Sequence, residues 1–249
     1  MRVAIVGSTG ALGQCLVREL RQRGHEVREL GRRVPTYRVD VSTGAGLDQA
    51  FDGCDAVVNA SNDSSKSARS TLVDGARHVG DAAHRTGVRH LVGVSIVGCE
   101  GVPLEYFRLK HLQERVVVEG AVPWSLLCST QFHGYLSRTF AAMSSWRLLP
   151  LPRALLAPVA ATEVAGALCD IAVGEPMRGR RLMAGPKNAD LRDLARIWLE
   201  ATGRSALVLP IRLPGSLGAA LREGVLAGTD ADLRGAVTFA EELGASGTP

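Results

Sequence analysis

The sequence predicts an α/β fold in which a parallel sheet is covered by helices on both faces, and three observations predict it. The first is the opening run Arg2–Val6, whose apolar and β-branched residues are typical of a buried strand. The second is the glycine-rich turn Gly7–Gly13, which directly follows that run and precedes an amphipathic helical pattern. The third is the repetition of this alternation along the first half of the chain. Strands that alternate with helices form parallel sheets.

The glycine-rich turn indicates a dinucleotide site. Glycine at position 7 permits a tight turn, Gly10 lets the backbone approach a pyrophosphate, and Gly13 lets helix and strand pack closely. The start of the following helix offers N–H groups and a partial positive charge to phosphates. We therefore predict a Rossmann-type, doubly wound parallel sheet. The residues of the turn expected to contact the cofactor are Gly7, Ser8, Thr9, Gly10, Ala11, Leu12 and Gly13.

Further strands and helices follow in order. Strands are predicted at 26–30, 37–41, 55–61, 89–95 and 123–128, and helices at 46–51, 70–85 and 104–119. Ligands of open α/β sheets bind outside the carboxyl ends of the strands. We therefore expect Asn59, Ala60 and Ser61 to lie beside the cofactor.

The residues after the second strand bear on the choice of cofactor. A carboxylate here would bind the ribose 2′-hydroxyl of NAD, whereas arginine accommodates the 2′-phosphate of NADP. The chain has Arg32 and Arg33 at this point and no carboxylate after Glu29. Guanidinium groups bind phosphate oxygens in a bidentate way. The pair favours NADP, and two solvated loop arginines are the alternative.

The helix predicted at 104–119 carries the chemistry. Tyr106 and Lys110 form a Tyr-x-x-x-Lys pair on one helical face, and Ser95 ends the preceding strand. With the glycine-rich turn, these residues resemble the Ser–Tyr–Lys triad of the short-chain dehydrogenase/reductase superfamily. The segments at 102–110 and 123–136 look like its atypical, NmrA-like NAD(P)H-binding branch.

This resemblance implies a role for each residue. Tyr106 is the expected proton donor, Lys110 binds the nicotinamide ribose, and Ser95 is a second hydrogen-bond donor. Thr130 is expected near the cofactor and is the substitute for Ser95, since only 11 positions separate Ser95 from Tyr106. An aspartate at the position of Asp40 often contacts the adenine ring in the family, with a plain turn role as the alternative.

The pattern changes beyond residue 148. Prolines break the chain into short pieces, with strands predicted at 155–160, 181–185 and 206–211 and helices at 162–173, 190–202 and 217–226. We expect a dinucleotide-binding domain at 1–148, a small C-terminal substrate lobe at 149–243, and a flexible tail at 244–249. Four aromatic residues precede the lobe and form either a pocket wall or the core of a helix: Phe132, Tyr135, Phe140 and Trp146.

Composition excludes several classes of function. No apolar run approaches the roughly 18 residues of a membrane span, and the first strand begins at Arg2, so we expect a cytoplasmic location. The five cysteines are scattered without metal-ligand spacing, so no metal is expected. The net charge is +4, but the arginines form no basic tract, which argues against nucleic-acid binding.

These observations favour an NADP-dependent oxidoreductase that acts on a small carbonyl or alcohol substrate, with Tyr106 as acid and base. Two alternatives stay open: an NmrA-like regulatory protein that binds NADP without turnover, and a non-redox isomerase or cyclase on the same fold. We expect a monomer or homodimer with a small-molecule substrate.

Overall fold

The computed structural model describes residues 1 to 145 and 147 to 246, which form two compact units. Unit 1 comprises residues 1–95, 105–128 and 164–181. Unit 2 comprises residues 96–104 and 129–163 and those from 182 onward. Among the described residues, no helix is both long and apolar enough to cross a membrane.

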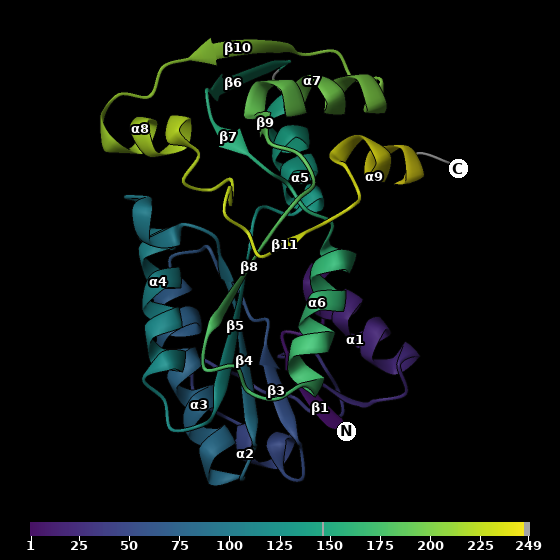
Figure 1. The fold of residues 1–249 in the computed structure, drawn as a ribbon, viewed down its shortest axis with the longest axis vertical. Coiled ribbons are helices and arrows are strands. Elements are labelled where there is room, and N and C mark those ends of the chain that lie inside the picture. Colours follow the sequence, from purple (N-terminus) through teal and green to yellow (C-terminus); the bar gives the residue numbers. More distant parts are fainter. Residues whose placement is uncertain (146, 247–249) are drawn as a thin grey trace. The chain divides into compact units, whose positions relative to one another are not determined.

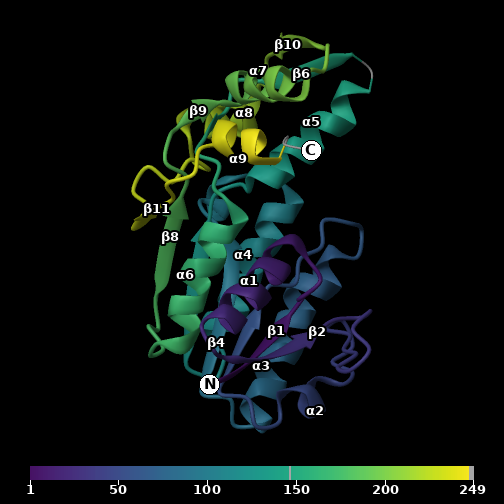
Figure 2. The ribbon, with the colours of Figure 1, turned by 90° about the vertical axis from the view of Figure 1, so that its right-hand side faces the viewer.

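Unit 1 holds most of the central sheet. Its elements, wholly or for the most part, are β1 (Arg2–Val6), α1 (Ala11–Gln22), β2 (Glu26–Leu30), α2 (Leu47–Phe51), β3 (Ala56–Asn59), a π-helical turn (Ser70–Asp74), α3 (Gly75–Arg85), β4 (His90–Ile96), α4 (Glu105–Val118), β5 (Trp124–Ser129) and α6 (Ala161–Val173). The seven-stranded sheet has the order β11-β8-β5-β4-β3-β1-β2, in which β8 is Arg180–Ala184 and β11 is Leu233–Arg234. Strands β2, β1, β3 and β4 pair in parallel. Helices α1 and α6 lie on one side of these strands and α3 and α4 on the other (Figures 1 and 2). The predicted doubly wound α/β fold is confirmed.

Burial explains why the first elements form where the sequence predicts them. Val3 to Val6 are buried without exception, so β1 is covered on both faces, as a central parallel strand requires. Helix α1 buries Leu12, Leu16, Val17 and Leu20, which recur at helical spacing. An ion pair of 2.5 Å between Arg23 and Asp170 links the end of α1 to α6.

The predicted strand at 37–41 is absent from the described structure. In this segment the structure has two isolated bridges, a parallel one between Gly31 and Arg38 and an antiparallel one between Asp40 and Ala45. Asp40 turns the chain, because its carboxylate accepts hydrogen bonds from the Ser42 N–H at 3.0 Å and the Ser42 hydroxyl at 2.7 Å. A side chain that binds its own backbone in this way competes with sheet pairing.

Three other predictions differ from the structure. The predicted helix at 70–85 begins with the π-helical turn Ser70–Asp74 before α3. The strand expected at 155–160 is limited to two residues, because Pro158 has no N–H to donate. Residues 244–246 were expected in a flexible tail but belong to the last helix.

Unit 2 is built from short elements. They are a 3₁₀ turn (Cys99–Gly101), α5 (His133–Ser144), β6 (Leu148–Pro152), β7 (Leu155–Leu156), most of β8 (Arg180–Ala184), β9 (Ala189–Asp190), α7 (Leu191–Thr202), β10 (Leu207–Ile211), α8 (Gly215–Glu223), β11 (Leu233–Arg234) and α9 (Phe239–Ser246). Strands β6 and β10 pair in parallel, and β7 and β9 antiparallel.

The core of unit 2 contains part of the predicted aromatic group. Phe140 is fully buried, and its ring centroid lies 5.9 Å from that of Trp198 and 6.5 Å from that of Phe239. Tyr135 is exposed, and Trp146 lies outside the described residues. Phe140 therefore has the core role.

Candidate dinucleotide site

The glycine-rich turn is tied to the end of β2. Gly7 has a φ of +82°, in the left-handed region that favours glycine. The N–H groups of Gly7 and Ser8 donate to the carbonyl of Leu30 at 3.0 and 3.2 Å, and the Ser8 hydroxyl donates to the same oxygen. The turn is therefore held to the end of β2 by three hydrogen bonds to one carbonyl oxygen.

The same turn fits a pyrophosphate. A Cβ on Gly13 would lie 2.2 Å from the Gly7 carbonyl oxygen, so only glycine allows α1 to pack this closely. A Cβ on Gly10 would meet that oxygen at 3.3 Å and no other described atom within 4 Å beyond its chain neighbours, so this side of the turn is open. Gly10 caps α1 with no side-chain hydrogen bond from the described residues. The first N–H groups of α1 are available to an anion.

The residues expected beside the cofactor lie next to this turn. The N–H of Ala60 donates to the Val6 carbonyl at 3.0 Å, and a Cβ on Gly7 would meet the Ala60 carbonyl at 3.0 Å. Asn59 is 2% exposed, and its Oδ1 accepts hydrogen bonds from the N–H and the hydroxyl of Ser61. The ends of β1 and β3 thus meet at one edge of the sheet, as the sequence predicts.

Arg32 and Arg33 are exposed directly after β2. Arg32 lies near Asp40: the pKa of that carboxyl is lowered first by the Ser42 hydroxyl, with a smaller contribution from the positive charge of Arg32. The Asp40 carboxylate already bonds Ser42. The structure therefore gives Asp40 a turn role, and the contact with adenine stays a prediction.

Tyr106 lies in the first turn of α4 and packs against the cluster formed by Ala68, Leu72, Val73 and Leu109. Its hydroxyl donates to Oδ1 of Asn62 at 3.0 Å. The sequence analysis missed Asn62, although it directly follows the residues expected beside the cofactor. The only feature of the sequence that could have indicated Asn62 is its polar side chain at the end of a strand. That feature does not indicate a hydrogen bond to a tyrosine 44 positions away.

The loop that carries Asn62 is held in place by Asp63. The Asp63 carboxylate accepts hydrogen bonds from the Ser65 N–H at 2.8 Å, the Ser67 hydroxyl at 2.9 Å and the Thr71 hydroxyl at 3.2 Å. The backbone hydrogen bond from Ser65 is the largest cause that lowers the pKa of Asp63. The partner of Tyr106 is thereby positioned by several contacts within one loop.

Lys110 is only 4% exposed. Its Nζ donates to the Val94 carbonyl at 2.8 Å and to Oε1 of Gln113 at 2.6 Å. Val94 immediately precedes Ser95, which is also buried. The ammonium group is therefore fixed against the carboxyl end of β4, beside the predicted serine.

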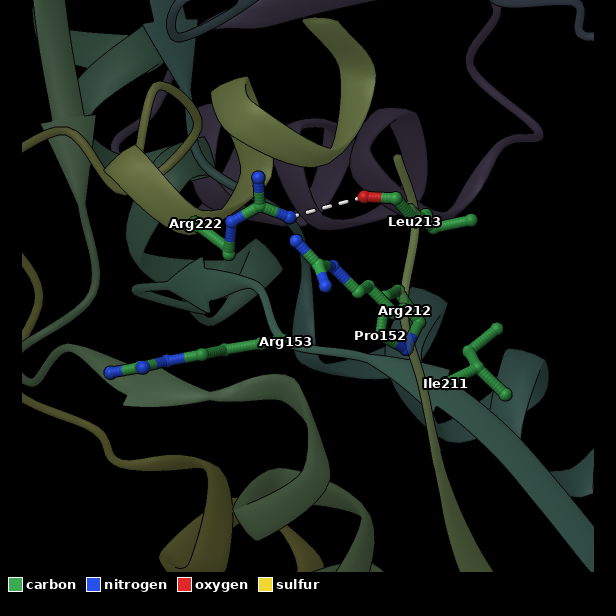
Figure 3. Close-up of a pocket in the computed structure, with 6 residues that line it drawn as sticks. All are labelled: Pro152, Arg153, Ile211, Arg212, Leu213 and Arg222. Carbon is green, nitrogen blue, oxygen red and sulfur yellow. Dashed lines mark hydrogen bonds between the residues drawn. The ribbon is translucent and has the colours of Figure 1, made fainter. Parts of the chain in front are cut away.

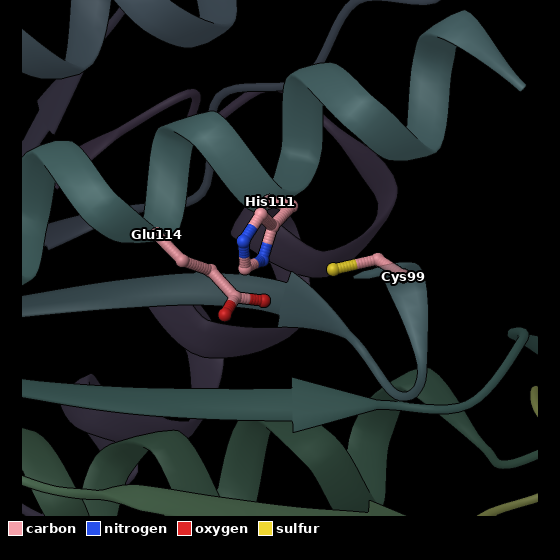
Figure 4. A group of neighbouring side chains, drawn as sticks. All are labelled: Cys99, His111 and Glu114. Carbon is pink, nitrogen blue, oxygen red and sulfur yellow. The ribbon is translucent and has the colours of Figure 1, made fainter. Parts of the chain in front are cut away.

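Two further polar residues of α4, His111 and Glu114, extend from the helix in Figure 4. Glu114 is 2% exposed and forms an ion pair of 2.9 Å with Arg180. The Cys128 thiol also donates weakly to it, at 3.8 Å. A buried carboxylate needs such partners, and this ion pair links α4 to Arg180.

In unit 2, the side chains of Thr130 and His133 both bond backbone carbonyl groups. The Thr130 hydroxyl donates to the Ala157 carbonyl at 2.5 Å. His133 is buried, with Nδ1 2.8 Å from Oε2 of Glu242 and Nε2 3.0 Å from the Pro158 carbonyl oxygen. Because both ring nitrogens have partners, His133 supports the docking of α9 and is a poor candidate for a proton donor to substrate.

The fold and the glycine-rich turn define a Rossmann-type dinucleotide-binding protein. The sequence profile of the NAD(P)H-binding family matches residues 7–133, just over half of the chain. The protein belongs to this NAD(P)H-binding family. No curated protein sequence matches it.

Solved structures share the fold over nearly the whole chain. A nucleoside-diphosphate-sugar epimerase from Staphylococcus aureus is 16% identical with a TM-score of 0.79, covering 98% of this chain and 100% of the other. An NADPH-dependent quinone oxidoreductase from Escherichia coli, complexed with NADPH, is 16% identical with a TM-score of 0.79, covering 99% and 100%. A Bordetella bronchiseptica enzyme in complex with NAD is 19% identical with a TM-score of 0.76, covering 98% and 91%.

Proposed function

We propose that the protein is an NADP-dependent oxidoreductase that transfers hydride between the cofactor and a small carbonyl or alcohol substrate. The observation that carries the proposal is the arrangement on α4: Tyr106 is held by Asn62, and Lys110 is fixed to the end of β4. This arrangement occurs in a chain of the NAD(P)H-binding family. The similar fold of the NADPH-dependent quinone oxidoreductase supports the same class of reaction.

Each proposed cofactor contact rests on a different part of unit 1. The turn Gly7–Gly13 would hold the pyrophosphate, and Arg32 and Arg33 the 2′-phosphate. Asn59–Ser61 would line the edge of the sheet, Asp40 would reach the adenine, and Lys110 would bind the ribose of the nicotinamide. When bound, the cofactor supplies the hydride.

The side chains then have complementary tasks. Negative charge develops on the carbonyl oxygen of the substrate, which needs a proton and a fixed hydrogen-bond donor. Tyr106 donates the proton after its hydroxyl leaves Asn62, and the ammonium of Lys110 favours the phenolate that remains. Ser95 supplies the second donor. Asn62 is a positioning residue, because it acts by holding Tyr106.

Titration with the two reduced cofactors tests the proposed choice of NADP. Wild type should bind NADPH more tightly than NADH. Arg32→Ala/Arg33→Ala should lose about 1.5–3 kcal/mol of NADPH binding, roughly ten- to a hundredfold, because charge-assisted hydrogen bonds to the phosphate are lost. Affinity for NADH should change little.

A matched control removes two other exposed arginines of unit 1, Arg85 on α3 and Arg115 on α4. Arg85→Ala/Arg115→Ala lowers the net charge equally and should retain the NADPH preference. A wild type that prefers NADH, or equal NADPH losses in the two double variants, would show that the assignment to NADP is wrong.

A further inference from the structure

A basic pocket of about 310 Å³ lies in unit 2, where the paired ends of β6 and β10 approach α8. Figure 3 shows its lining residues, three of which are arginines and none of which is acidic. They are Pro152, Arg153, Ile211, Arg212, Leu213 and Arg222. The volume is at the lower end of the roughly 300–1,000 Å³ that is typical of small-molecule sites.

A backbone carbonyl group positions one of the three guanidinium groups. Arg222 on α8 donates to the Leu213 carbonyl at 3.1 Å. A Cβ on Gly218 would lie 1.8 Å from that carbonyl oxygen and 2.9 Å from Nη1 of Arg222, so the glycine makes room for both. In Figure 3 the Arg212 side chain extends toward Arg222. Two cations that face each other repel unless an anion lies between them.

The nearest acid leaves this charge largely uncompensated. Asp190 lies 3.9 Å from Nε of Arg153, but its carboxylate already accepts hydrogen bonds from the backbone N–H of Arg192 at 3.0 Å and from its Nε at 2.9 Å. Arg192 is therefore the main partner of Asp190. The guanidinium of Arg153 therefore keeps most of its donors uncommitted to Asp190, and in Figure 3 its side chain extends away from that of Arg212.

We propose that this pocket binds a small organic diphosphate. The three guanidinium groups carry charge +3 and present forked donors that match phosphate oxygens in a bidentate way. A diphosphate balances that charge better than a single carboxylate does. Pro152, Ile211 and Leu213 form an apolar part of the lining against which an organic substituent would pack. The proposal concerns unit 2 alone and does not depend on the function proposed above.

Calorimetric titration with inorganic pyrophosphate tests the site. Saturating NADPH is added, because the glycine-rich turn of unit 1 is expected to bind pyrophosphate as well. Wild type should bind pyrophosphate under these conditions, with an affinity that falls as salt is raised. Arg212→Gln/Arg222→Gln should weaken binding at least tenfold. Arg153→Gln, which removes no described hydrogen bond, should weaken it at least threefold without affecting folding.

The matched control is Arg138→Gln/Arg196→Gln, which removes two exposed arginines of unit 2 outside the pocket. It should bind pyrophosphate like wild type. If both double variants lose the same pyrophosphate affinity, the effect comes from the net charge of the protein, and the proposed site is overturned. Absence of binding, or its abolition by NADPH, would also overturn it.

Phenyl phosphate should bind more tightly than inorganic phosphate, and equal affinities would refute the role of the apolar lining.

Discussion

Alanine at Gly13 should damage both folding and cofactor binding, and the structure sets the size of the effect. The added Cβ would lie 2.2 Å from the Gly7 carbonyl oxygen and 2.8 Å from Cα of Ser8, whereas ordinary contacts begin at 3.4 Å. All of these are backbone atoms, so α1 must move by about 1 Å. Overpacking of this kind costs about 1–3 kcal/mol, and rigid neighbours favour the upper end. A loss of about 3 kcal/mol lowers Tm by about 6–12 °C in a protein of this size.

Gly10→Ala, compared with Gly13→Ala, separates the effect on cofactor binding from the effect on folding. Its Cβ would meet the Gly7 oxygen at 3.3 Å, and its φ of −74° and ψ of 166° suit alanine. Tm should therefore stay close to the wild-type value, within the effect of about 0.5 kcal/mol that is usual for surface changes. NADPH affinity should fall at least tenfold, because the methyl group projects from the open side of the turn, where the pyrophosphate is expected.

Thermal unfolding by circular dichroism and calorimetric titration with NADPH measure the two effects separately. The expected pattern is a stable Gly10→Ala protein that binds poorly and a destabilised Gly13→Ala protein that also binds poorly. If Gly10→Ala binds NADPH like wild type, the pyrophosphate does not lie on this turn. If Gly13→Ala melts like wild type, the close packing of α1 against the turn is not the reason for glycine there.

Two further predictions concern catalysis and pH. Tyr106→Phe should lower kcat about 10²–10⁴-fold and leave NADPH affinity nearly unchanged, whereas Lys110→Ala should lower both kcat and NADPH affinity. Steady-state rates measure kcat, and titrations measure the affinity. Full turnover by Tyr106→Phe would refute the assignment of Tyr106 as proton donor. Burial lowers the pKa of His90, so this residue takes up a proton at a lower pH in the folded protein than in the unfolded chain, where a histidine does so below about pH 6.5. Stability should therefore fall from pH 7.5 to pH 5.5 in urea unfolding, and His90→Gln should reduce that fall; an unchanged slope would contradict it.

The opening of the chain could be predicted from sequence because several local signals agree there. The apolar run before Gly7, the glycine spacing and the helical recurrence from Leu12 to Leu20 each specify the same strand, turn and helix. The candidate site residues at the end of β3 were predicted for a related reason. In a parallel sheet, residues at the ends of successive strands lie at one edge.

What the sequence analysis missed depends on contacts between distant residues. Nothing in the local pattern links Asn62 to Tyr106, because the hydrogen bond forms only when α4 packs beside the loop after β3. Strand β6 was missed because its prolines suggest a break, yet in a two-stranded sheet both strands are edges, where proline is tolerated. The pairing of β6 with β10 also brings Arg153 near Arg212, which no spacing could show.

Transfer of deuterium decides between a hydride-transferring enzyme and the two alternatives, a regulatory protein and a non-redox isomerase or cyclase. NADPH that carries two deuterium atoms at C4 of the nicotinamide is incubated with the protein and a panel of aldehydes and ketones, and the products are examined by mass spectrometry. The proposal predicts NADPH consumption with at least one carbonyl substrate of the panel and one deuterium in the alcohol formed. Tyr106→Phe should slow this transfer strongly. Tight NADPH binding with no consumption and no deuterated product from any substrate would contradict the proposed oxidoreductase function.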